Sequence, residues 1–230
     1  MPGLGRIPEK KPQQQNYLLS KVMTTLRPIP ESEWPVKKNW QSIVNLNQGN
    51  TGTCVGHGFA HRMEDAPVRR PAEEVDAYKI YRRACQLDAW PDNDDGDLNF
   101  GTSVDAGAQA CKQMGYISNF YWAWDLHTAE EFVLNRGSLV IGVTWYEEMF
   151  EPVYAEVKPG VMRWIIRPEG RVAGGHCLLV NGRNRELNTW RLKNSWGRDW
   201  GVGGQVSMRD KDMEFLLADG GEFCWPQEIR

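Results

Sequence analysis

The 230-residue sequence has no apolar run of membrane-spanning length, no cluster of Lys or Arg and no Cys-x-x-Cys pair. The first absence argues against a transmembrane helix. The second argues against a nucleic acid or an anionic membrane as a partner, in line with a net charge of −3. The third, together with irregular spacing, argues against a disulfide framework or a zinc knuckle. The five cysteines are Cys54, Cys85, Cys111, Cys177 and Cys224.

The N-terminus also lacks the apolar stretch of a secretory signal, because residues 9–15 are Glu, Lys, Gln and one Pro. We therefore expect a cytoplasmic or otherwise intracellular chain that needs no metal and no cofactor. Hydrophobic residues make up 41% of the sequence, which is enough for one sizeable core or two small lobes.

Three regions differ in composition. Residues 1–38 are rich in Pro, Gln and charge and predict an extended arm with a short helix near residues 18–26. Residues 39–122 carry helical patterns, whereas residues 123–230 carry mainly the alternation of strands. Helices followed by strands are typical of an α+β protein, here with a helical lobe packed on a β lobe.

Capping signals place several helices within this outline. Ser103 predicts the start of a helix that Gly115 ends, and Thr128 with Glu131 resembles a capping box for a short helix before Gly137. Helices are expected from residue 54 onward and at 72–87 and 103–113, and strands at 139–145, 161–166, 176–180, 189–194 and 204–208. The acidic loop 90–97 has the Asp density of a calcium loop, but it lacks the closing Glu of a hand-type site and is interpreted as a solvated connection.

The glycine-containing loop 47–53 leads into a helix pattern that begins at Cys54. Thr53 lies where an N-cap hydroxyl is favoured, and apolar residues then recur at every fourth position. A cysteine at a helix N-terminus faces unpaired N–H groups and the positive end of the helix dipole, which both favour the thiolate. Gly56 and Gly58 predict close packing of this helix, and the whole arrangement suits a nucleophile.

Two strand patterns flank the turn-rich stretch 181–188. An antiparallel hairpin centred near Arg185 places His176 opposite Asn194, close enough for an imidazole–amide hydrogen bond. The same register pairs Leu178 with Leu192 and Val180 with Trp190. Cys177 then points to the opposite face of the sheet and is expected in the core.

These residues form a set that suits thiol chemistry. A cysteine nucleophile needs a base, and the base needs a partner on its second ring nitrogen, which an Asn carbonyl oxygen can provide. The developing oxyanion needs donors, which the backbone N–H of Cys54 and the side-chain amide of Gln48 can supply.

The sequence resembles the papain-like cysteine peptidases in three motifs: Gln48-Gly49-x-x-Gly52-x-Cys54, Gly175-His176 and Lys193-Asn194-Ser195-Trp196-Gly197. The resemblance implies a two-lobed fold, with a cleft between a helical left lobe and a barrel-like β right lobe. It implies Cys54 as nucleophile, His176 as general base and then acid, Asn194 as the residue that orients His176, and Gln48 in the oxyanion hole. Cys54 and His176 are then expected to form a thiolate–imidazolium pair that attacks protein or peptide substrates.

The resemblance also implies residues beside the bound substrate. Gly101 and Gly175 are expected at the substrate strand, and Trp196 is expected to cover the His176–Asn194 hydrogen bond. The sequence departs from the family at Thr51, where a disulfide cysteine is usual, and at Val55, where an aromatic is usual. The arm is too short for the usual inhibitory pro-domain, so either it covers part of the cleft or activity is controlled by context. This architecture favours a bacterial or phage protein.

Three alternatives stay open at the level of sequence. Thiol–imidazole sites also cut peptidoglycan peptides, although no wall-binding repeat or basic surface is visible. A catalytically silent binding or assembly module could keep the same fold, although the intact set of four residues argues against silence. His57 and His61 follow Cys54 on the same helix, but no fourth ligand for a metal is evident.

Overall fold

The computed structural model describes residues 1–9, 17–70, 74–90 and 97–229. In this part of the chain no helix is long and apolar enough to cross a membrane. The acidic loop 90–97 falls largely outside the described residues.

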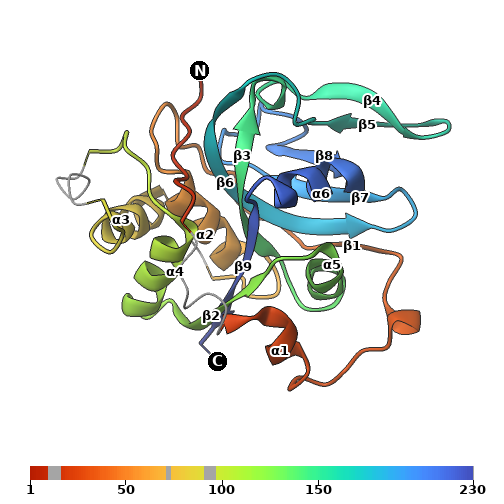
Figure 1. The fold of residues 1–230 in the computed structure, drawn as a ribbon, viewed down its shortest axis with the longest axis horizontal. Coiled ribbons are helices and arrows are strands. Elements are labelled where there is room, and N and C mark those ends of the chain that lie inside the picture. Colours follow the sequence, from red (N-terminus) through yellow and green to blue (C-terminus); the bar gives the residue numbers. More distant parts are fainter. Residues whose placement is uncertain (10–16, 71–73, 91–96, 230) are drawn as a thin grey trace.

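Strands of the described residues form one mixed sheet, in the order β2-β9-β3-β6-β7-β8-β5-β4, with β1 paired to β6 (Figure 1). β2 and β4 lie at the two ends of this order, so the sheet is not closed into a barrel. The strands are β1 (Lys37–Asn39), β2 (Ile117–Ala123), β3 (Leu139–Tyr146), β4 (Val153–Lys158), β5 (Val161–Ile165), β6 (Val172–Asn184), β7 (Thr189–Lys193), β8 (Gln205–Arg209) and β9 (Glu222–Glu228).

Helices cover both faces of this sheet. α2, α3 and α4 pack together on one face, while α5 and α6 lie with the other (Figure 1). The helices are α1 (Leu19–Met23), η2 (Glu31–Glu33), α2 (Cys54–Glu64), α3 (Glu74–Cys85), α4 (Val104–Gln113), α5 (Leu126–Asn135), η4 (Glu147–Met149) and α6 (Asp210–Ala218). The expected α+β architecture is therefore confirmed, while the lobe boundaries at residues 38 and 122 stay a prediction.

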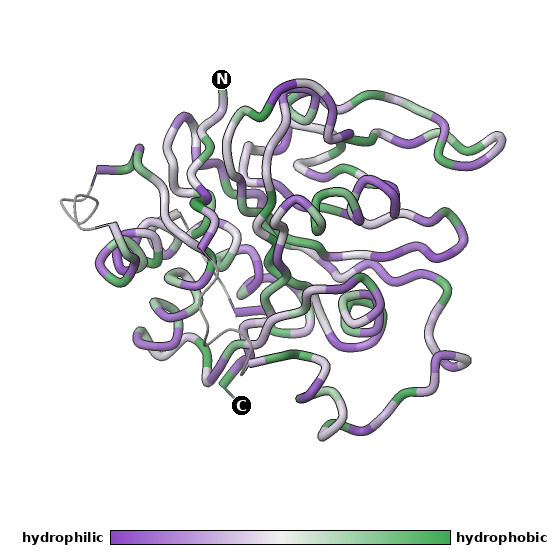
Figure 2. The backbone as a smooth tube through the Cα atoms, in the orientation of Figure 1, coloured by the Kyte–Doolittle hydropathy of each residue, from purple (hydrophilic) through white to green (hydrophobic). Residues whose placement is uncertain are grey.

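The alternation of the central strands builds two hydrophobic cores. On β6, Leu178 and Val180 belong to the core beneath α5 and α6, whereas Cys177 and Leu179 belong to the core beneath α2 and α4. Figure 2 shows the hydrophobic stretches gathered along these central strands, with hydrophilic stretches in the outer loops. The prediction that Cys177 is a core residue is thus confirmed, because it is fully buried.

Close packing of the helix after Cys54 is also confirmed. A Cβ atom on Gly56 would lie 2.1 Å from the carbonyl oxygen of Ala77 in α3. A Cβ atom on Gly58 would lie 2.9 Å from the Cys177 sulfur in β6. These two glycines let α2 approach both of its neighbours.

Thr53 is the N-cap residue of α2 as predicted, but without a side-chain capping bond, and the predicted capping box at Thr128 is wrong. The Thr53 side chain makes no capping bond to α2; its hydroxyl instead contacts the Thr51 hydroxyl at 2.7 Å and His57 Nδ1 at 3.2 Å. α5 begins at Leu126 rather than after Thr128, because the Asp125 carboxylate accepts hydrogen bonds from both the backbone N–H and the hydroxyl of Thr128. Ser103 does cap α4, accepting a hydrogen bond from the Ala106 N–H at 3.1 Å.

The predicted register of the β6–β7 hairpin is wrong by two residues or more. Val180 pairs with Leu192, and Leu179 pairs with Lys193. A bulge between Val180 and Gly182 shifts the pairing further, so that Arg183 faces Trp190. The hairpin still brings His176 and Asn194 to the same end of the two strands, as expected.

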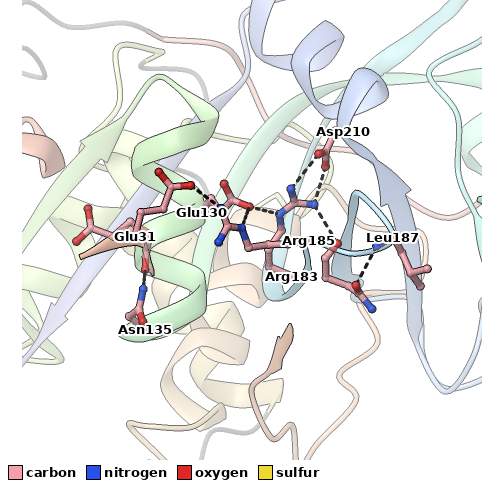
Figure 3. A network of polar contacts seen from close by, with 9 residues as sticks. Glu31, Glu130, Asn135, Arg183, Arg185, Leu187 and Asp210 are labelled. Carbon is pink, nitrogen blue, oxygen red and sulfur yellow. Dashed lines mark hydrogen bonds and ion pairs between the residues drawn. The ribbon is translucent and has the colours of Figure 1, made fainter. Parts of the chain in front are cut away.

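The far end of the same hairpin anchors the arm (Figure 3). Arg183 donates to Glu130 of α5 at 2.9 Å and to Asp210 of α6 at 2.7 Å. Arg185 binds Glu31 in η2. The Arg185–Glu31 contact and the pairing of β1 with the second half of β6 hold residues 31–39 against the sheet.

Candidate active site

Cys54 is the first residue of α2 and is fully buried. Burial raises the pKa of its thiol to about 12, while backbone hydrogen bonds from Cys177, Gly5 and Val55, and the charge of Arg6, lower it in part. The thiol is therefore next to the backbone of Cys177, the neighbour of His176 on β6. The expected thiolate is not the form that this environment favours, because the helix terminus does not outweigh the loss of water.

His176 and Asn194 are joined as the sequence predicts. His176 Nε2 lies 2.7 Å from Asn194 Oδ1, and the backbone N–H of Ser195 donates to that same oxygen at 2.8 Å. Since Oδ1 is an acceptor, His176 must carry its proton on Nε2 and donate it. His176 Nδ1 then holds a lone pair, and it has no hydrogen-bond partner in the described part of the chain.

Aromatic rings enclose His176. Its ring centroid lies 4.7 Å from that of Trp145 and 4.8 Å from that of Trp196. Burial lowers the pKa of His176 to about 4, against the hydrogen bond with Asn194, and the nearby His57 lowers it further. The structure thus places Trp196 beside the His176 ring, as expected, and Trp145 as well. The sequence did not single out Trp145, because its contact with His176 depends on the pairing of β3 with β6.

Gln48 lies at the same site, and both ends of its amide are bonded. The Nε2 group donates to the carbonyl oxygens of Thr51 at 2.7 Å and Gly3 at 3.1 Å. The Oε1 atom accepts from the Ser195 hydroxyl at 2.5 Å. Ser195 therefore fixes Gln48 through its hydroxyl and Asn194 through its N–H. In the sequence, the only sign of this positioning role is that Ser195 directly follows Asn194.

The N-terminal segment (residues 1–9) runs across this site, between the helices and β6 (Figure 1). The N–H groups of Gly5 and Arg6 both donate to the Gly175 carbonyl oxygen, at 3.1 and 2.9 Å. Thr102 donates its N–H to the Gly5 carbonyl oxygen and accepts from Ile7. The first residues of the chain thus fill the space in front of Cys54. The sequence had left open whether the arm covers part of the cleft, and in this structure it does.

Gly175 and Gly101 lie against this segment in different ways. Gly175 binds it through its carbonyl oxygen. Gly101 donates its N–H to the Tyr81 hydroxyl at 3.1 Å, and a Cβ atom there would lie 2.2 Å from the Gly5 carbonyl oxygen. Thr102, rather than Gly101, pairs with the N-terminal segment as a strand would, and the missing side chain of Gly101 lets the segment approach closely.

The two histidines of α2 each make a hydrogen-bond contact within the protein, although His61 Nδ1 is buried without a partner among the described residues. His57 Nδ1 lies 3.0 Å from the Thr53 carbonyl oxygen, and its ring stands edge-on to Tyr78. His61 Nε2 accepts from the Leu46 N–H at 3.0 Å. Among the described residues no group of three His, Cys, Asp or Glu side chains is placed to hold a metal ion. All five cysteines are free and buried.

Solved structures show what this architecture is similar to. Xylellain, a cysteine protease from Xylella fastidiosa, matches 100% of this chain and 97% of its own, with a TM-score of 0.70 and 17% sequence identity. Procathepsin L2 from the larval midgut of Tenebrio molitor matches 98% of this chain and 78% of its own, with a TM-score of 0.68 and 16% identity. The chain has the papain-like cysteine peptidase fold.

The likeness to these papain-like proteins lies in structure rather than in sequence. The proform of the ragweed pollen protease Amb a 11 matches 87% of this chain and 67% of its own, with a TM-score of 0.56 and 14% identity. No protein-family model matches the sequence, and no curated protein matches it. At these identities the comparison supports the papain-like fold, and the activity has to be argued from the site itself.

Proposed function

We propose that this papain-like chain is a cysteine peptidase that hydrolyses peptide bonds in proteins or peptides through an acyl-enzyme. The observation that carries the proposal is the His176–Asn194 hydrogen bond of 2.7 Å. It fixes the ring with its proton on Nε2 and leaves the lone pair of Nδ1 to accept a proton from a thiol.

In the proposed reaction, His176 Nδ1 takes the proton of Cys54, and the thiolate sulfur attacks the carbonyl carbon of the substrate. The resulting oxyanion accepts hydrogen bonds from the Cys54 N–H and the Gln48 amide. The C–N bond then breaks, and His176 gives its proton to the leaving amine. Water, deprotonated by the same Nδ1 atom, hydrolyses the thioester and releases Cys54.

Three features support Gln48 and Asn194 in these roles. The Gln48 amide already donates to a peptide carbonyl, that of Gly3, which is the kind of group it would meet in a substrate. Ser195 bonds both residues and so couples the oxyanion donor to the orienting residue. Trp145 and Trp196 keep water away from the imidazole, which strengthens the hydrogen bond to Asn194.

The N-terminal segment must leave before a substrate enters, so the test uses a full-length variant in which it cannot sit as it does. In Gly5→Ala a Cβ atom would lie 1.8 Å from the Gly52 carbonyl oxygen, a distance that no side chain tolerates. We expect this variant to hydrolyse a mixture of fluorogenic peptides. Removing the base in Gly5→Ala/His176→Ala should lower kcat about 10²–10⁴-fold.

Gly5→Ala/Cys54→Ala should be inactive and serves as the control for contaminating peptidases. Mass spectrometry of the stalled reaction should find the acyl group on Cys54. A Gly5→Ala variant that alkylates readily at Cys54 but cleaves no peptide would overturn the proposal and favour a binding module.

A further inference from the structure

A polar hollow lies at the turn end of the β6–β7 hairpin, away from the end that carries His176 and Asn194. It is a cavity of about 160 Å³ whose walls come from β1, β5, β6, β7 and β8. None of its lining residues belongs to the candidate active site. We call it the hairpin hollow, and its polar lining residues include Lys37, Arg163, Asn184, Thr189, Arg191 and Ser207.

Strand pairing brings the first of these side chains together. Lys37 of β1 pairs with Asn184 of β6, and Asn184 pairs with Thr189 of β7. Directly paired residues point their side chains to the same face of a sheet. An ammonium group, an amide and a hydroxyl therefore form one row across three strands.

A second row lies beside the first. Arg191 of β7 pairs with Ser207 of β8, and Ser207 pairs with Ile165 of β5. Arg191 is two residues after Thr189, so the alternation along β7 places this row on the same face. Arg163, two residues before Ile165, faces the same way. The hollow thus collects cations from β1, β5 and β7, which are far apart in the sequence.

The positive charge of the hairpin hollow is not balanced by the residues around it. Lys37, Arg163 and Arg191 form no ion pair among the described residues, and no carboxylate from this part of the chain lines the hollow. The other lining cation, Arg183, is bound by carboxylates of α5 and α6 instead (Figure 3). An anion is therefore the ligand that the charges of the hollow favour.

Arg191 shows the cost of this imbalance. It is half-buried, and burial lowers the pKa of its guanidinium, against the attraction of Asp65. Its Nε atom donates to Asn181 Oδ1 at 2.9 Å and its Nη2 atom donates to the Trp40 carbonyl oxygen at 2.6 Å. Nη1 makes no hydrogen bond among the described residues. An anion in the hollow would offset the burial of this charge and accept from the spare donor.

A phosphoryl group matches the donors of the wall. Near pH 7 it carries a charge of about −1.5 to −2 and several strong acceptor oxygens. The ammonium and guanidinium groups supply charge, and the Thr189 and Ser207 hydroxyls can donate further hydrogen bonds. A space of about 160 Å³ has room for several water-sized atoms, as in a phosphate. A carboxylate, with a single charge, would leave more of the positive charge unbalanced.

An aromatic groove continues from the hairpin hollow. Its space of about 500 Å³ shares Arg163, Arg191 and Ser207 with the hollow, and its other lining residues include Tyr154 and Trp164. The ring centroids of Tyr154 and Trp164 lie 5.5 Å apart, and both side chains are exposed. Exposed aromatic rings pack well against flat organic groups. An organic group attached to the phosphate therefore has a surface on which to lie.

We propose that the hairpin hollow is a binding site for a phosphoryl group, with Lys37, Arg163 and Arg191 as its cations. The ligand is either free phosphate or a phosphate monoester whose organic group lies on Trp164. The site is separate from the proposed peptidase residues, so neither proposal depends on the other.

Phosphorus NMR of inorganic phosphate tests the site in the full-length protein, with the ionic strength held constant by sodium chloride. The protein should broaden the phosphate signal in a saturable way. Lys37→Gln/Arg163→Gln removes two exposed cations and should weaken binding by about tenfold, since each exposed charge pair contributes about 2–5-fold. The charge-matched control is Lys158→Gln/Arg171→Gln, which removes two exposed cations outside the hollow and should leave binding unchanged.

Thermal unfolding gives a second readout. Phosphate should raise the Tm of the unmodified protein above its value in sodium chloride of equal ionic strength, because a ligand of the folded state stabilises it. This gain should shrink in Lys37→Gln/Arg163→Gln and persist in the control variant. Equal weakening in the two double variants would show diffuse attraction to surface charge and overturn the site, as would broadening that does not saturate.

Phenyl phosphate distinguishes the two sources of the phosphoryl group. Binding about 2–10-fold tighter than that of inorganic phosphate, with the gain lost in Trp164→Leu, would assign the site to a monoester. Equal affinities, unchanged in Trp164→Leu, would assign it to free phosphate. If neither compound binds above the sodium chloride baseline, the proposal is wrong.

Discussion

Arg6 and Lys193 are both buried cations held by buried carboxylates, and each adjoins the candidate site, Arg6 at Gly175 and Lys193 at Asn194. Lys193, on β7, binds Glu64 and Asp65, which end the helix that Cys54 begins. Arg6 belongs to the N-terminal segment and binds Glu222 at the start of β9. One cluster joins two elements of the folded core, and the other joins the core to a segment at the end of the chain.

The Lys193 cluster is completed by further side chains. Asn181 donates to the Asp65 carboxylate at 3.0 Å, and Arg191 donates to Asn181 at 2.9 Å. Because Lys193 directly precedes Asn194, this cluster ties the end of α2 to the strand that positions the His176 partner. It holds the Cys54 helix and the His–Asn pair in one rigid frame.

The Arg6 pair instead holds the N-terminal segment across the candidate site. The segment also makes backbone hydrogen bonds to Gly49, Gly175 and Thr102 and accepts one from the Gln48 amide at Gly3. Side chains contribute as well, because the Ser103 hydroxyl donates to the Glu9 carboxylate at 2.7 Å and Leu4 packs on the core. A substrate strand offers the same kinds of backbone groups. Burial alone therefore does not tell an ion pair within the core from one that anchors a terminal segment; the element that carries the cation does.

The largest effect should come from removing the structural cation. Lys193→Ala leaves Glu64 and Asp65 buried without their partner, and breaking such a pair costs about 3–5 kcal/mol in unfolding free energy. Arg6→Ala should cost less, because water can reach Glu222 once the segment leaves. Urea unfolding of both variants measures the difference.

Lys193→Met, which fills a similar volume without charge, is the matched control and still leaves both carboxylates without their cation. Equal losses of stability in Arg6→Ala and Lys193→Ala would mean that the N-terminal segment is as much a part of the core as β7.

A smaller effect should come from loosening the segment without touching its charge. With the segment seated, the pKa of Cys54 is raised to about 12 and that of His176 is lowered to about 4, so the full chain should alkylate slowly at pH 5–6. Gly5→Ala forces the segment away and lets water in, which moves both pKa values back toward a charged pair. Overpacking at this position destabilises the seated form by about 1–3 kcal/mol. The form with the segment displaced then becomes about 10–100-fold more populated, and we expect alkylation at pH 6 to be faster by the same factor.

The rate should then depend on His176. In Gly5→Ala/His176→Ala the labelling at pH 6 should fall back, while labelling at pH 9 should remain. An alkylation rate that simply climbs through pH 8–9 in Gly5→Ala would show an ordinary thiol and contradict the ion pair.

How far the sequence predicts this site depends on how local each feature is. The helix that begins at Cys54 and the His176–Asn194 pair follow from motifs and from strand alternation, and the pair forms even though the predicted hairpin register is wrong. The bulge between Val180 and Gly182 depends on packing between strands, which periodicity does not reveal. The predicted capping bonds failed where two polar residues compete: Asp125 prevails over Thr128, and the Thr53 hydroxyl is used by other side chains.

Some of the features that the sequence missed are made by distant residues, whereas others, such as the unpredicted helix α6, are local. The sequence did not predict β9, which contains a proline, Pro226. This residue pairs with Phe120 of β2, in the part of β9 that has no pairing with β3. Arg6 and Glu222 are 216 positions apart and meet only in the folded chain. Gly3 and Gly5 contact the loop of residues 49–52, and nothing in a Gly- and Pro-rich N-terminus distinguishes such contacts from an open arm.

The smallest expected effect tests how charge is distributed in the Lys193 cluster. One cation faces two carboxylates, so a proton on one of them makes the group neutral. Burial raises the pKa of Glu64 to about 7, against the attraction of Lys193, and Asp65 raises it further. A carboxyl whose pKa is raised in the folded state adds stability below its unfolded pKa near 4.5 and loses it as the pH rises through about 7.

Between pH 5.5 and 8 the unfolding free energy should therefore fall by about 1 kcal/mol, after allowance for screening at the helix end. Glu64→Gln, which mimics the protonated side chain, should lose this dependence and equal the unmodified protein near pH 5.5. The measurement is urea unfolding across this pH range, with the exposed Glu147→Gln as control, which should leave the slope unchanged. If the advantage of the unmodified protein over Glu64→Gln instead grew toward pH 8, the ionised Glu64 would be the stabilising partner of Lys193. The cluster would then hold its two negative charges against one cation, and the structural pair would differ from Arg6–Glu222 in net charge as well as in location.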